Sequence, residues 1–442
     1  MRISLLTLFP ELYDSFLSSS LIGRAQKAGI MQAQVHTFFD YCEQSKRVDA
    51  PTFGYGSGVL LRPEVVAQAI DANEAAHGKA LKIFFSPQGK QLTQDLAREL
   101  VQRILTSESQ HLMLVASRYE GMDARVEELY ADEQISIGNY VLMGGDLPSM
   151  VFLEAILRHV PGVVGKQDSV AHDSFTGAFV DHPSYTAPVE WRGMRVPEIL
   201  RSGNHGAIDA WRLEQAARAT VLKHFTWLRS CAMTEHERGL AANYIPRHYV
   251  ALMHDEVRLK TQDSQELVGT SSVTTIDIHD IARSSCTYGL KNVFIVTPLA
   301  DQQAIVKTML EFWLGGKGEA YNPSRYKAVQ RVRLIESLNA VCAAIREQEG
   351  VDPLIVVTSA RQADAASGPE RITYFDQERV WQHGRPVLIV LGTAQGLASS
   401  VLQRADYVLE PIRGFSDFNH LSVRSAAAII FDRWLGINLA RR

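Results

Sequence analysis

A glycine-rich segment at residues 136–148 is the part of the sequence best suited to hold a small ligand. It reads Ser-Ile-Gly-Asn-Tyr-Val-Leu-Met-Gly-Gly-Asp-Leu-Pro, and a helical pattern follows it directly. Glycine permits positive φ angles and lets the backbone approach a ligand closely. The backbone N–H and C=O groups of such a loop could recognise a nucleoside. A tight strand-to-helix connection explains the same glycines equally well.

Two further loops, 85–89 and 118–121, shift the balance towards a ligand site. They read Phe-Ser-Pro-Gln-Gly and Arg-Tyr-Glu-Gly, and each directly follows a β-rich run. Ligands of open α/β sheets bind in the crevice outside the carboxyl ends of the strands. The three loops therefore predict one ligand crevice. The sequence around Gly54 lacks the Gly-x-Gly-x-x-Gly spacing, and no Gly-Lys-Ser/Thr phosphate loop occurs, which disfavours dinucleotide dehydrogenases and nucleoside triphosphatases.

The loops need strands and helices to position them, and the hydrophobic pattern supplies both. Short β-rich runs alternate with helical patterns, which is typical of βαβ units and a parallel sheet. Helices are expected at 94–105 and 149–160. Strands are expected at 3–9, 34–39, 81–85, 111–116 and 134–141 in the first half, and at 249–253, 292–297, 354–358, 387–391 and 407–409 in the second.

The overall composition is that of a globular protein with more than one domain. The 442 residues are 46% hydrophobic and carry a net charge of −4, so a nucleic-acid partner would need locally concentrated positive charge. The four cysteines lie far apart without a Cys-x-x-Cys pair, which argues against a zinc site or disulfide framework and favours the cytoplasm. No apolar run is long enough to predict a transmembrane helix.

A basic stretch between residues 191 and 223 supplies such a local concentration of charge. Arginines can contact phosphates, and tryptophans can stack on bases, so the stretch is suited to RNA. A solvated helical face with buried tryptophans is the alternative. The residues concerned are Trp191, Arg192, Arg195, Arg201, Trp211, Arg212, Arg218 and Lys223.

A set of motifs in residues 1–235 identifies a family. In order they are Gly23-Arg24-Ala25, Ser86-Pro87-Gln88-Gly89, Arg118-Tyr119-Glu120-Gly121, Ser136-Ile137-Gly138, Gly144-Gly145, Asp173-Ser174-Phe175 and Ser202-Gly203-Asn204-His205. Together they closely resemble the bacterial tRNA (guanine-N1)-methyltransferases of the SPOUT superfamily. The resemblance implies a trefoil-knotted domain that binds S-adenosylmethionine and forms a homodimer with shared active sites. It also implies tRNA as substrate, methylated at the guanosine 3′-adjacent to the anticodon, position 37.

The resemblance also implies which residues hold S-adenosylmethionine. They are Phe84, Phe85, Ser86, Pro87, Gln88, Ser117, Tyr119, Glu120, Gly121, Ser136, Ile137, Gly138, Tyr140, Leu142, Gly144 and Gly145. The family is associated with a divalent metal, magnesium, but the sequence shows no ligand cage, and Glu120 is only a guess as ligand. Positions that depart from the family pattern are Tyr55, Ser117, Asn139, Asp146 and Ala187.

Methylation of guanine N1 needs a general base, because that nitrogen carries a proton. Charge that develops on O6 must also be met by a cation or a hydrogen-bond donor. The resemblance places Asp173 as the base and Arg158 as its electrostatic partner. Without the family, Asp173 could be a helix N-cap, and Arg158 could form an ordinary i,i+4 ion pair with Glu154.

Residues 247–442 resemble a less characterised SPOUT-type family of S-adenosylmethionine-dependent RNA methyltransferase domains. Motifs that carry the resemblance include Val296-Thr297-Pro298-Leu299, the run 391–397, Glu410-Pro411-Ile412-Arg413-Gly414 and the run 419–425. The alternative is a non-catalytic module that binds RNA or the cofactor. The expected cofactor residues are Thr297, Pro298, Leu299, Gly392, Gly396, Glu410, Pro411, Ile412, Arg413 and Ser422.

The sequence therefore predicts an α/β protein with two trefoil-knotted SPOUT methyltransferase domains, both with parallel sheets. The first domain is expected at 1–165 and the second at 247–442. A loop and a small helical tRNA-binding segment, 166–240, should join them, with the main boundary near 236–247.

Overall fold

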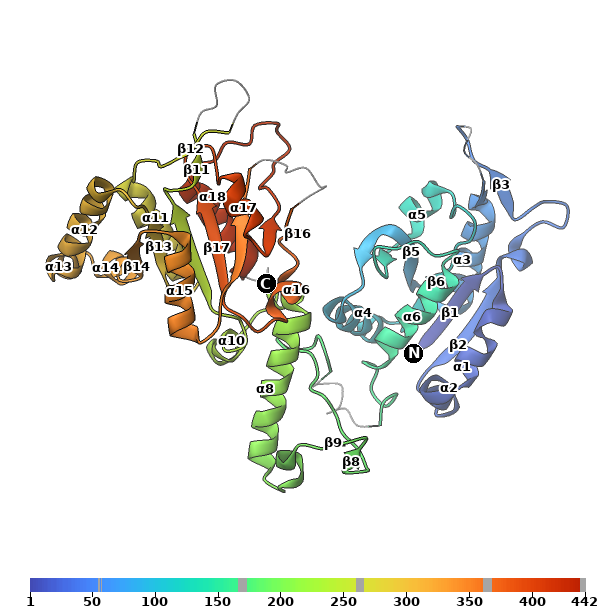
Figure 1. Ribbon diagram of the computed structural model, residues 1–442. Helices are drawn as coiled ribbons and strands as arrows, with labels where there is room; N and C mark the ends of the chain where they lie inside the picture. The colour runs from blue at the N-terminus through green and yellow to red at the C-terminus, as the bar shows by residue number, and fades with distance from the viewer. Residues whose placement is uncertain (55, 57, 166–172, 260–265, 361–367, 438–442) are drawn as a thin grey trace. The chain divides into compact units, whose positions relative to one another are not determined.

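Two compact α/β units make up the chain, Met1–Gly177 and Ala178–Arg442 (Figure 1). The computed structural model describes residues 1–442 except 55, 57, 166–172, 260–265, 361–367 and 438–442. Tyr55 and the start of the expected middle segment lie outside the described residues. Among the described residues, no helix is both long and apolar enough to cross a membrane.

A five-stranded sheet forms the centre of the first unit, in the order β2-β1-β6-β5-β7, and all of its pairs are parallel. Its strands are β1 (Arg2–Thr7), β2 (Gln32–Thr37), β5 (Ala80–Gln91), β6 (His111–Val115) and β7 (Glu133–Ser136). A separate antiparallel pair joins β3 (Asp49–Pro51) to β4 (Val59–Leu61). The helices are η1 (Pro10–Tyr13), α1 (Asp14–Ser18), α2 (Ser20–Lys27), η2 (Phe38–Tyr41), α3 (Pro63–His77), α4 (Gln94–Thr106), α5 (Ala124–Tyr130) and α6 (Asp146–Leu157).

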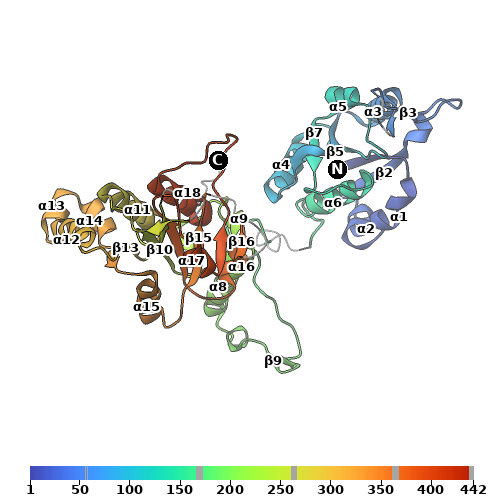
Figure 2. The ribbon, with the colours of Figure 1, turned by 45° about the horizontal axis from the view of Figure 1, so that its top comes forward.

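Helices cover both faces of this sheet, because alternate strand residues enter two different cores. Ile83 packs with residues of α4 and α6, whereas its neighbour Phe84 packs with residues of α3 and α5. Figure 2 shows α3 and α5 on one side of the sheet and α6 on the other. Both faces of a parallel sheet must be buried in this way, which explains why its strands read as continuous apolar runs.

The second unit contains a seven-stranded sheet in the order β14-β13-β10-β17-β15-β18-β16, again with parallel pairs. Its strands are β10 (His248–Met253), β13 (Val293–Val296), β14 (Val332–Ile335), β15 (Leu354–Thr358), β16 (Glu370–Ile372), β17 (Val387–Gly392) and β18 (Tyr407–Leu409). Short antiparallel pairs join β8 (Glu190–Trp191) to β9 (Met194–Arg195) and β11 (Val257–Arg258) to β12 (Val268–Gly269).

Helices again lie on both faces of the second sheet. Those of the sheet domain are α11 (Thr275–Thr287), α12 (Ala300–Leu314), α13 (Lys317–Tyr321), α14 (Pro323–Val329), α15 (Leu338–Glu349), α16 (Gln377–Trp381), α17 (Ser399–Gln403) and α18 (Val423–Leu435). Residues of α11, α14 and α18 share one core, and residues of α15 and α17 share the other. Figure 2 shows α11 and α18 on the side of the sheet opposite α15.

The helical segment that lies between the two sheets in the sequence belongs to the second unit. It consists of η3 (Glu198–Arg201), α8 (His205–Lys223), α9 (Phe225–Leu228) and α10 (Glu235–Ala242). Phe225 stacks edge-on against Trp381 with 4.6 Å between ring centroids, and both belong to the core around α18. The boundary between the two compact units therefore falls at Gly177/Ala178, ahead of the main boundary expected near 236–247.

The parallel sheets and the expected strands are confirmed, with two clear differences in length. The strand expected at 81–85 continues to Gln91, so residues 85–89, predicted to be a loop, form an irregular part of β5 where its register with β7 shifts. The run 134–141 was expected to be a single strand, but β7 ends at Ser136. Gly138 takes φ +152°, which breaks the extended backbone and turns the chain into the glycine-rich loop. The trefoil knots stay a prediction of the family resemblance.

Candidate functional sites

The first site is a pocket of about 470 Å³ at the carboxyl ends of β6 and β7, beside the irregular part of β5 where its register with β7 shifts. The three loops predicted from the sequence converge here. Among the expected cofactor residues, the pocket is lined by Phe85, Ser86, Pro87, Gln88, Ser117, Tyr119, Glu120, Gly121, Ser136, Ile137, Gly138, Tyr140, Leu142, Gly144 and Gly145. The remaining one, Phe84, is fully buried in the core beneath α3 and α5 and does not line the pocket.

Direct backbone contacts hold the three loops together. The N–H of Gly145 donates to the carbonyl of Ser117 over 2.7 Å, and the N–H of Leu92 donates to the carbonyl of Ser136 over 2.7 Å. A Cβ atom at Gly145 would lie 2.8 Å from the backbone nitrogen of Ser117, closer than real Cβ atoms approach. Glycine is therefore required at this position for the loops to meet.

The buried carboxylate of Asp146 braces the floor of this site. Its Oδ2 accepts a hydrogen bond from Arg118 Nε over 2.6 Å, while Oδ1 accepts from Thr7 and Tyr13 over 2.5 and 3.1 Å. Burial, reinforced by Asp146, raises the pKa of Tyr13 well above its usual range. Sequence analysis noted Asp146 only as a departure from the family pattern. An acid in the first turn of a helix is too common to reveal this role.

The loop after β6 carries backbone strain beside the ligand space. Tyr119 adopts φ +60° and is half exposed, and Gly121 adopts φ +110°. A left-handed conformation is unfavourable for a non-glycine residue and concentrates at functional sites. The Tyr119 side chain lines the pocket.

The residues of the pocket suit a nucleoside. Pro87, Ile137 and Leu142 offer apolar contact for a base. Within the described part of the chain, the backbone N–H groups of Tyr140 and Leu142 have no hydrogen-bond partner, so they are free to bind ligand acceptors. Apolar walls with a few convergent polar groups are characteristic of cofactor sites.

Asp173 and Arg158 form an ion pair with each other. Arg158 follows the last residue of α6, and its Nη2 lies 2.5 Å from Asp173 Oδ2, without the angles of a hydrogen bond. The Asp173 side chain is 19% exposed and that of Arg158 is 43% exposed. Neither residue lines the first pocket within this chain.

No complete metal cage is present in the described residues, where no three His, Cys, Asp or Glu side chains gather closely enough to hold an ion. Magnesium is commonly held by one or two carboxylates together with water and substrate groups. Glu120 lines the first pocket, and nothing in the described residues assigns it to a metal. No catalytic step is assigned to a metal.

The basic stretch is open to solvent. Its arginines and Lys223 are exposed, and the exposed ring of Trp191 has the Arg192 guanidinium 4.8 Å from its centroid. Trp211 is half-buried against Tyr185. Phosphates can reach these cations, and the Trp191 ring has a face available for stacking.

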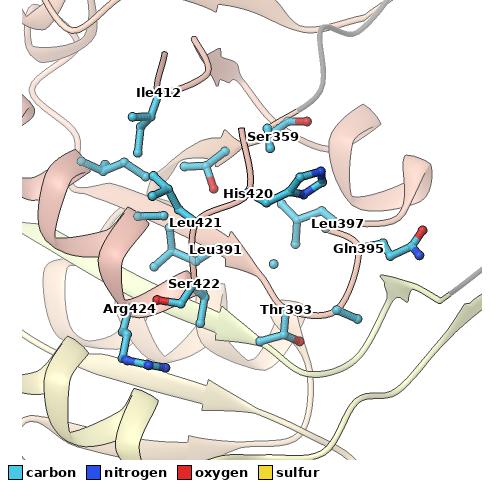
Figure 3. Close-up of a pocket in the computed structure, with 18 of the residues that line it drawn as sticks. Ser359, Leu391, Thr393, Gln395, Leu397, Ile412, His420, Leu421, Ser422 and Arg424 are labelled. Atoms are coloured by element: carbon cyan, nitrogen blue, oxygen red, sulfur yellow. The ribbon is translucent and has the colours of Figure 1, made fainter. Parts of the chain in front are cut away.

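A second crevice, of about 940 Å³, opens at the carboxyl ends of β10, β17, β15 and β18 (Figure 3). Of the expected cofactor residues, Gly392, Gly396, Glu410, Ile412 and Ser422 line it. Figure 3 shows Thr393, Gln395 and Leu397 on the loop after β17 and Ser422 and Arg424 at the start of α18, on the opposite side of the crevice. As in the first unit, a strained loop follows a central strand, with Ala394 at φ +51° and Gly396 at φ +100°.

The other expected residues of the second site lie outside this lining. Thr297, Pro298 and Leu299 follow β13, which β10 separates from β17. Thr297 is buried, and its hydroxyl accepts a hydrogen bond from the Leu299 N–H over 3.4 Å. Pro411 and Arg413 adjoin the lining residue Ile412 but are not part of the lining formed by the described residues. Sequence periodicity identifies strand ends but not the order of strands across a sheet.

Sequence reasoning missed two members of a polar cluster in the same crevice. His254 follows β10 directly, and Ser271 lies beyond the β11-β12 hairpin. Arg424 at the start of α18, which the sequence suggested as a contact to RNA or substrate, donates to Asp277 on α11 over 2.9 Å. Only the fold brings these residues together, because they are far apart in sequence.

Comparison with known proteins assigns a family to each half. Residues 1–229 match the family model described as tRNA (Guanine-1)-methyltransferase TrmD. Residues 247–436 match the model described as SAM-dependent RNA methyltransferase.

Two relatives named tRNA (guanine-N(1)-)-methyltransferase match along their whole length. The protein of Nitratidesulfovibrio vulgaris is 40% identical over 442 residues, and that of Oleidesulfovibrio alaskensis is 37% identical; in both cases 99% of each chain is covered. A third relative of that name, from Staphylococcus carnosus, is 40% identical over 245 residues, which are 55% of this chain and 97% of the relative. A protein of that name can therefore consist of the first half alone.

Proposed function

This chain belongs to the tRNA (guanine-1)-methyltransferase family, and we propose that its first unit methylates N1 of the guanosine at position 37 of tRNA. The methyl donor is S-adenosylmethionine. The observation that carries the proposal is the convergence of the irregular part of β5 and the loops after β6 and β7 on one nucleoside-sized pocket. The protein is proposed to act on tRNA in the cytoplasm.

The residues of the first pocket hold the donor in place. Bound S-adenosylmethionine supplies an already activated methyl group, so alignment with the acceptor nitrogen is the main task of the protein. Pro87, Ile137 and Leu142 enclose the base, while the free N–H groups of Tyr140 and Leu142 fix its position. The Asp146–Arg118 pair keeps the loops from opening.

Asp173 and Arg158 act on the guanine. The Asp173 carboxylate accepts the proton of N1 as the N1–CH3 bond forms and the S–CH3 bond breaks. Arg158 meets the negative charge that builds up on O6 and keeps Asp173 in place through their 2.5 Å contact.

Because neither residue lines the pocket of its own chain, the proposal includes a homodimer in which one subunit supplies Asp173 to the pocket of the other. Exposed apolar side chains on and before α6 favour such an interface. Leu147 and Val151 are 59% and 49% exposed, and Val141 and Met143 of the preceding loop are more than four-fifths exposed. Contiguous exposed apolar surface is characteristic of interaction sites.

The second unit is proposed to be a further S-adenosylmethionine-dependent RNA methyltransferase domain, whose substrate is not assigned. Its crevice lies at the carboxyl ends of β10, β17, β15 and β18, whose order across the sheet matches that of β1, β6, β5 and β7 in the first unit. The exposed basic stretch before α10 is proposed to hold the tRNA.

Methyl transfer to a defined tRNA tests the proposal. The full chain is incubated with labelled S-adenosylmethionine and an unmodified transcript with guanosine at position 37, and the labelled nucleoside is mapped. Asp173→Asn should lower the N1 rate by about 100-fold or more, the usual contribution of a general base. Asp95→Asn, in an exposed Asp–Arg pair on α4, is the matched control and should leave the rate unchanged. An unaltered N1 rate in Asp173→Asn would contradict the assignment.

A further inference from the structure

An unpartnered histidine lies at the inner end of the second crevice. His254 follows the last residue of β10, is 1% exposed and lines the crevice. Its Nε2 is buried and has no hydrogen-bond partner among the described residues. A buried polar atom without a partner is costly, and a bound ligand removes that cost by supplying one.

The hydrogen bonds around His254 determine which of its nitrogens carries the proton. The Thr393 hydroxyl donates its only hydrogen to the Met253 carbonyl over 2.8 Å. Ser271 Oγ, 2.5 Å from Thr393 Oγ1, must therefore donate to Thr393. Ser271 can then only accept from His254 Nδ1, which lies 3.1 Å away. This arrangement leaves Nε2 unprotonated, as a hydrogen-bond acceptor.

Burial keeps this imidazole neutral. It lowers the pKa of His254 to about 4, although Asp277 and the Ser272 carbonyl act in the opposite direction. A neutral acceptor cannot bind a phosphate or carboxylate oxygen, because neither has a hydrogen to donate at neutral pH. The ligand must present an N–H or O–H group.

We propose that His254 Nε2 accepts a hydrogen bond from a ribose hydroxyl of a nucleoside bound in the second crevice. The inference rests on the proposed function of the second unit, since both ligands of such a domain, S-adenosylmethionine and RNA, carry ribose hydroxyls. The hydrogen-bond chain Met253–Thr393–Ser271–His254 links the end of β10 to the strained loop after β17. It holds the imidazole in one tautomer before the ligand arrives.

Three substitutions separate this role from a structural one. His254→Asn can keep the contact to Ser271 but loses the acceptor, whereas His254→Gln places an amide oxygen near the position of Nε2. His248→Asn is the matched control, because His248 is equally buried in β10 but has partners for both nitrogens, Pro246 and Trp434.

The test measures binding to the second unit in the full chain by calorimetry. All variants carry Gly144→Val, which is expected to block the first pocket: it adds a branched side chain to the pocket lining and displaces Arg118, because a Cβ at Gly144 would lie 2.4 Å from Arg118 Cδ. The probes are methylthioadenosine, which has the donor's ribose but no amino-acid group, and an unmodified tRNA transcript with its same-sequence DNA counterpart. S-adenosylhomocysteine is titrated in parallel.

If the ribose belongs to the donor, His254→Asn should weaken methylthioadenosine about ten-fold or more, while His254→Gln and His248→Asn bind it nearly as the parent does. Binding of free adenine, which keeps the N6 amino group but has no ribose, should not change in His254→Asn; a loss for adenine as well would make the N6 amino group the donor and overturn the proposal.

If the ribose belongs to RNA, the same variant should weaken the transcript about ten-fold and leave its DNA counterpart and methylthioadenosine unchanged. Unchanged affinity for every probe would overturn the proposal. So would a loss confined to S-adenosylhomocysteine, because the amino group of its amino-acid part would then be the donor.

A different result would show that the proposed function of the second unit is wrong. If the Gly144→Val chain without further substitution bound neither methylthioadenosine nor the transcript, both the proposed domain function and this inference would be overturned. The N1 activity of the first unit, measured without Gly144→Val, is independent of either result.

Discussion

The two sheets of this chain share a core of four strands arranged in the same way. Across the first sheet the strands lie in the order β1-β6-β5-β7, and across the second in the order β10-β17-β15-β18. In both, the strand that comes third in the sequence lies between the first and the second. The second crevice opens at the carboxyl ends of its four strands, and the first at those of β6 and β7 beside the irregular part of β5. Even the strained loops correspond, with positive φ at Tyr119 and Gly121 in one and at Ala394 and Gly396 in the other. The site therefore follows from the strand order and loop conformation more than from particular side chains.

The units differ in how each crevice is braced. A buried ion pair, Asp146–Arg118, joins the loops of the first. A chain of neutral hydrogen bonds ending at His254 joins those of the second. The second sheet is also extended by β13 and β14 beyond β10, and its unit incorporates the helical segment. These differences predict different responses to mutation and pH.

Removal of the Asp146 carboxylate should have the largest effect on stability. Asp146→Ala leaves Arg118 without its partner and Thr7 and Tyr13 without an acceptor, so the first unit should lose about 3–5 kcal/mol. Denaturant unfolding can assign this loss, because all six tryptophans lie in the second unit. Circular dichroism should show an early transition, while tryptophan fluorescence should keep its midpoint. A shift of both signals by the same amount would mean that the units do not unfold independently.

Acid should destabilise the second unit through its buried histidines. Burial lowers the pKa of His248 and of His254 to about 4. Between pH 6.5 and 4 the unfolded chain binds protons that the folded chain excludes, so stability falls as the pH falls through this window. Each histidine should contribute on the order of 3 kcal/mol by pH 4. Fluorescence-detected unfolding at several pH values measures the slope, and His248→Asn should reduce it. An equally steep slope in that variant would remove His248 from the account.

Arg229 tests whether the helical segment belongs to the second unit. Its guanidinium donates to the carbonyls of Asp432 and Arg433 at the end of α18 over 2.7 and 2.5 Å, and it is buried. Arg229→Met should destabilise the second unit by about 2–3 kcal/mol, because charged hydrogen bonds are lost, and hydrogen exchange in α8 should rise. Arg212→Met, on the exposed face of α8, is the control that should leave stability unchanged. Faster exchange confined to α18 would show that α8 does not depend on this contact.

The smallest effect concerns the strained loop of the second unit. Ala394→Gly removes the strain of the left-handed conformation but raises the conformational entropy of the unfolded chain. The free energy of unfolding of the second unit should therefore rise by only about 0.5 kcal/mol. Ala394→Val should instead destabilise it, because β-branched residues tolerate positive φ least. The thermal midpoint followed by fluorescence measures both, and a gain from valine would mean that the loop is not strained.

Much of this arrangement could be predicted from sequence, for identifiable reasons. The apolar runs predicted the central strands because both faces of a parallel sheet are buried. Glycines at the ends of strands indicated the first pocket, since close backbone contacts such as Gly145 to Ser117 leave no room for a side chain. Phe84 was expected in that pocket, but alternation along β5 turns it into the core instead.

What sequence could not supply was the spatial order of the strands. Thr297 follows a strand in the same way as Gly392, yet β10 separates β13 from β17 and leaves Thr297 outside the crevice. His254 and Ser271 escaped notice because a histidine after a strand and a serine in a polar stretch carry no local signal. Arg229 could not be recognised either, because its hydrogen-bond partners lie about two hundred residues later in the chain.

The stoichiometry of S-adenosylmethionine binding tests most directly whether each sheet carries its own crevice. Calorimetry on the full chain should give two equivalents per chain, and Gly144→Val should reduce this to one without altering the tryptophan fluorescence of the second unit. A wild-type chain that binds one equivalent, and loses it with Gly144→Val, would contradict the account by showing that the shared strand order does not make the second crevice a cofactor site.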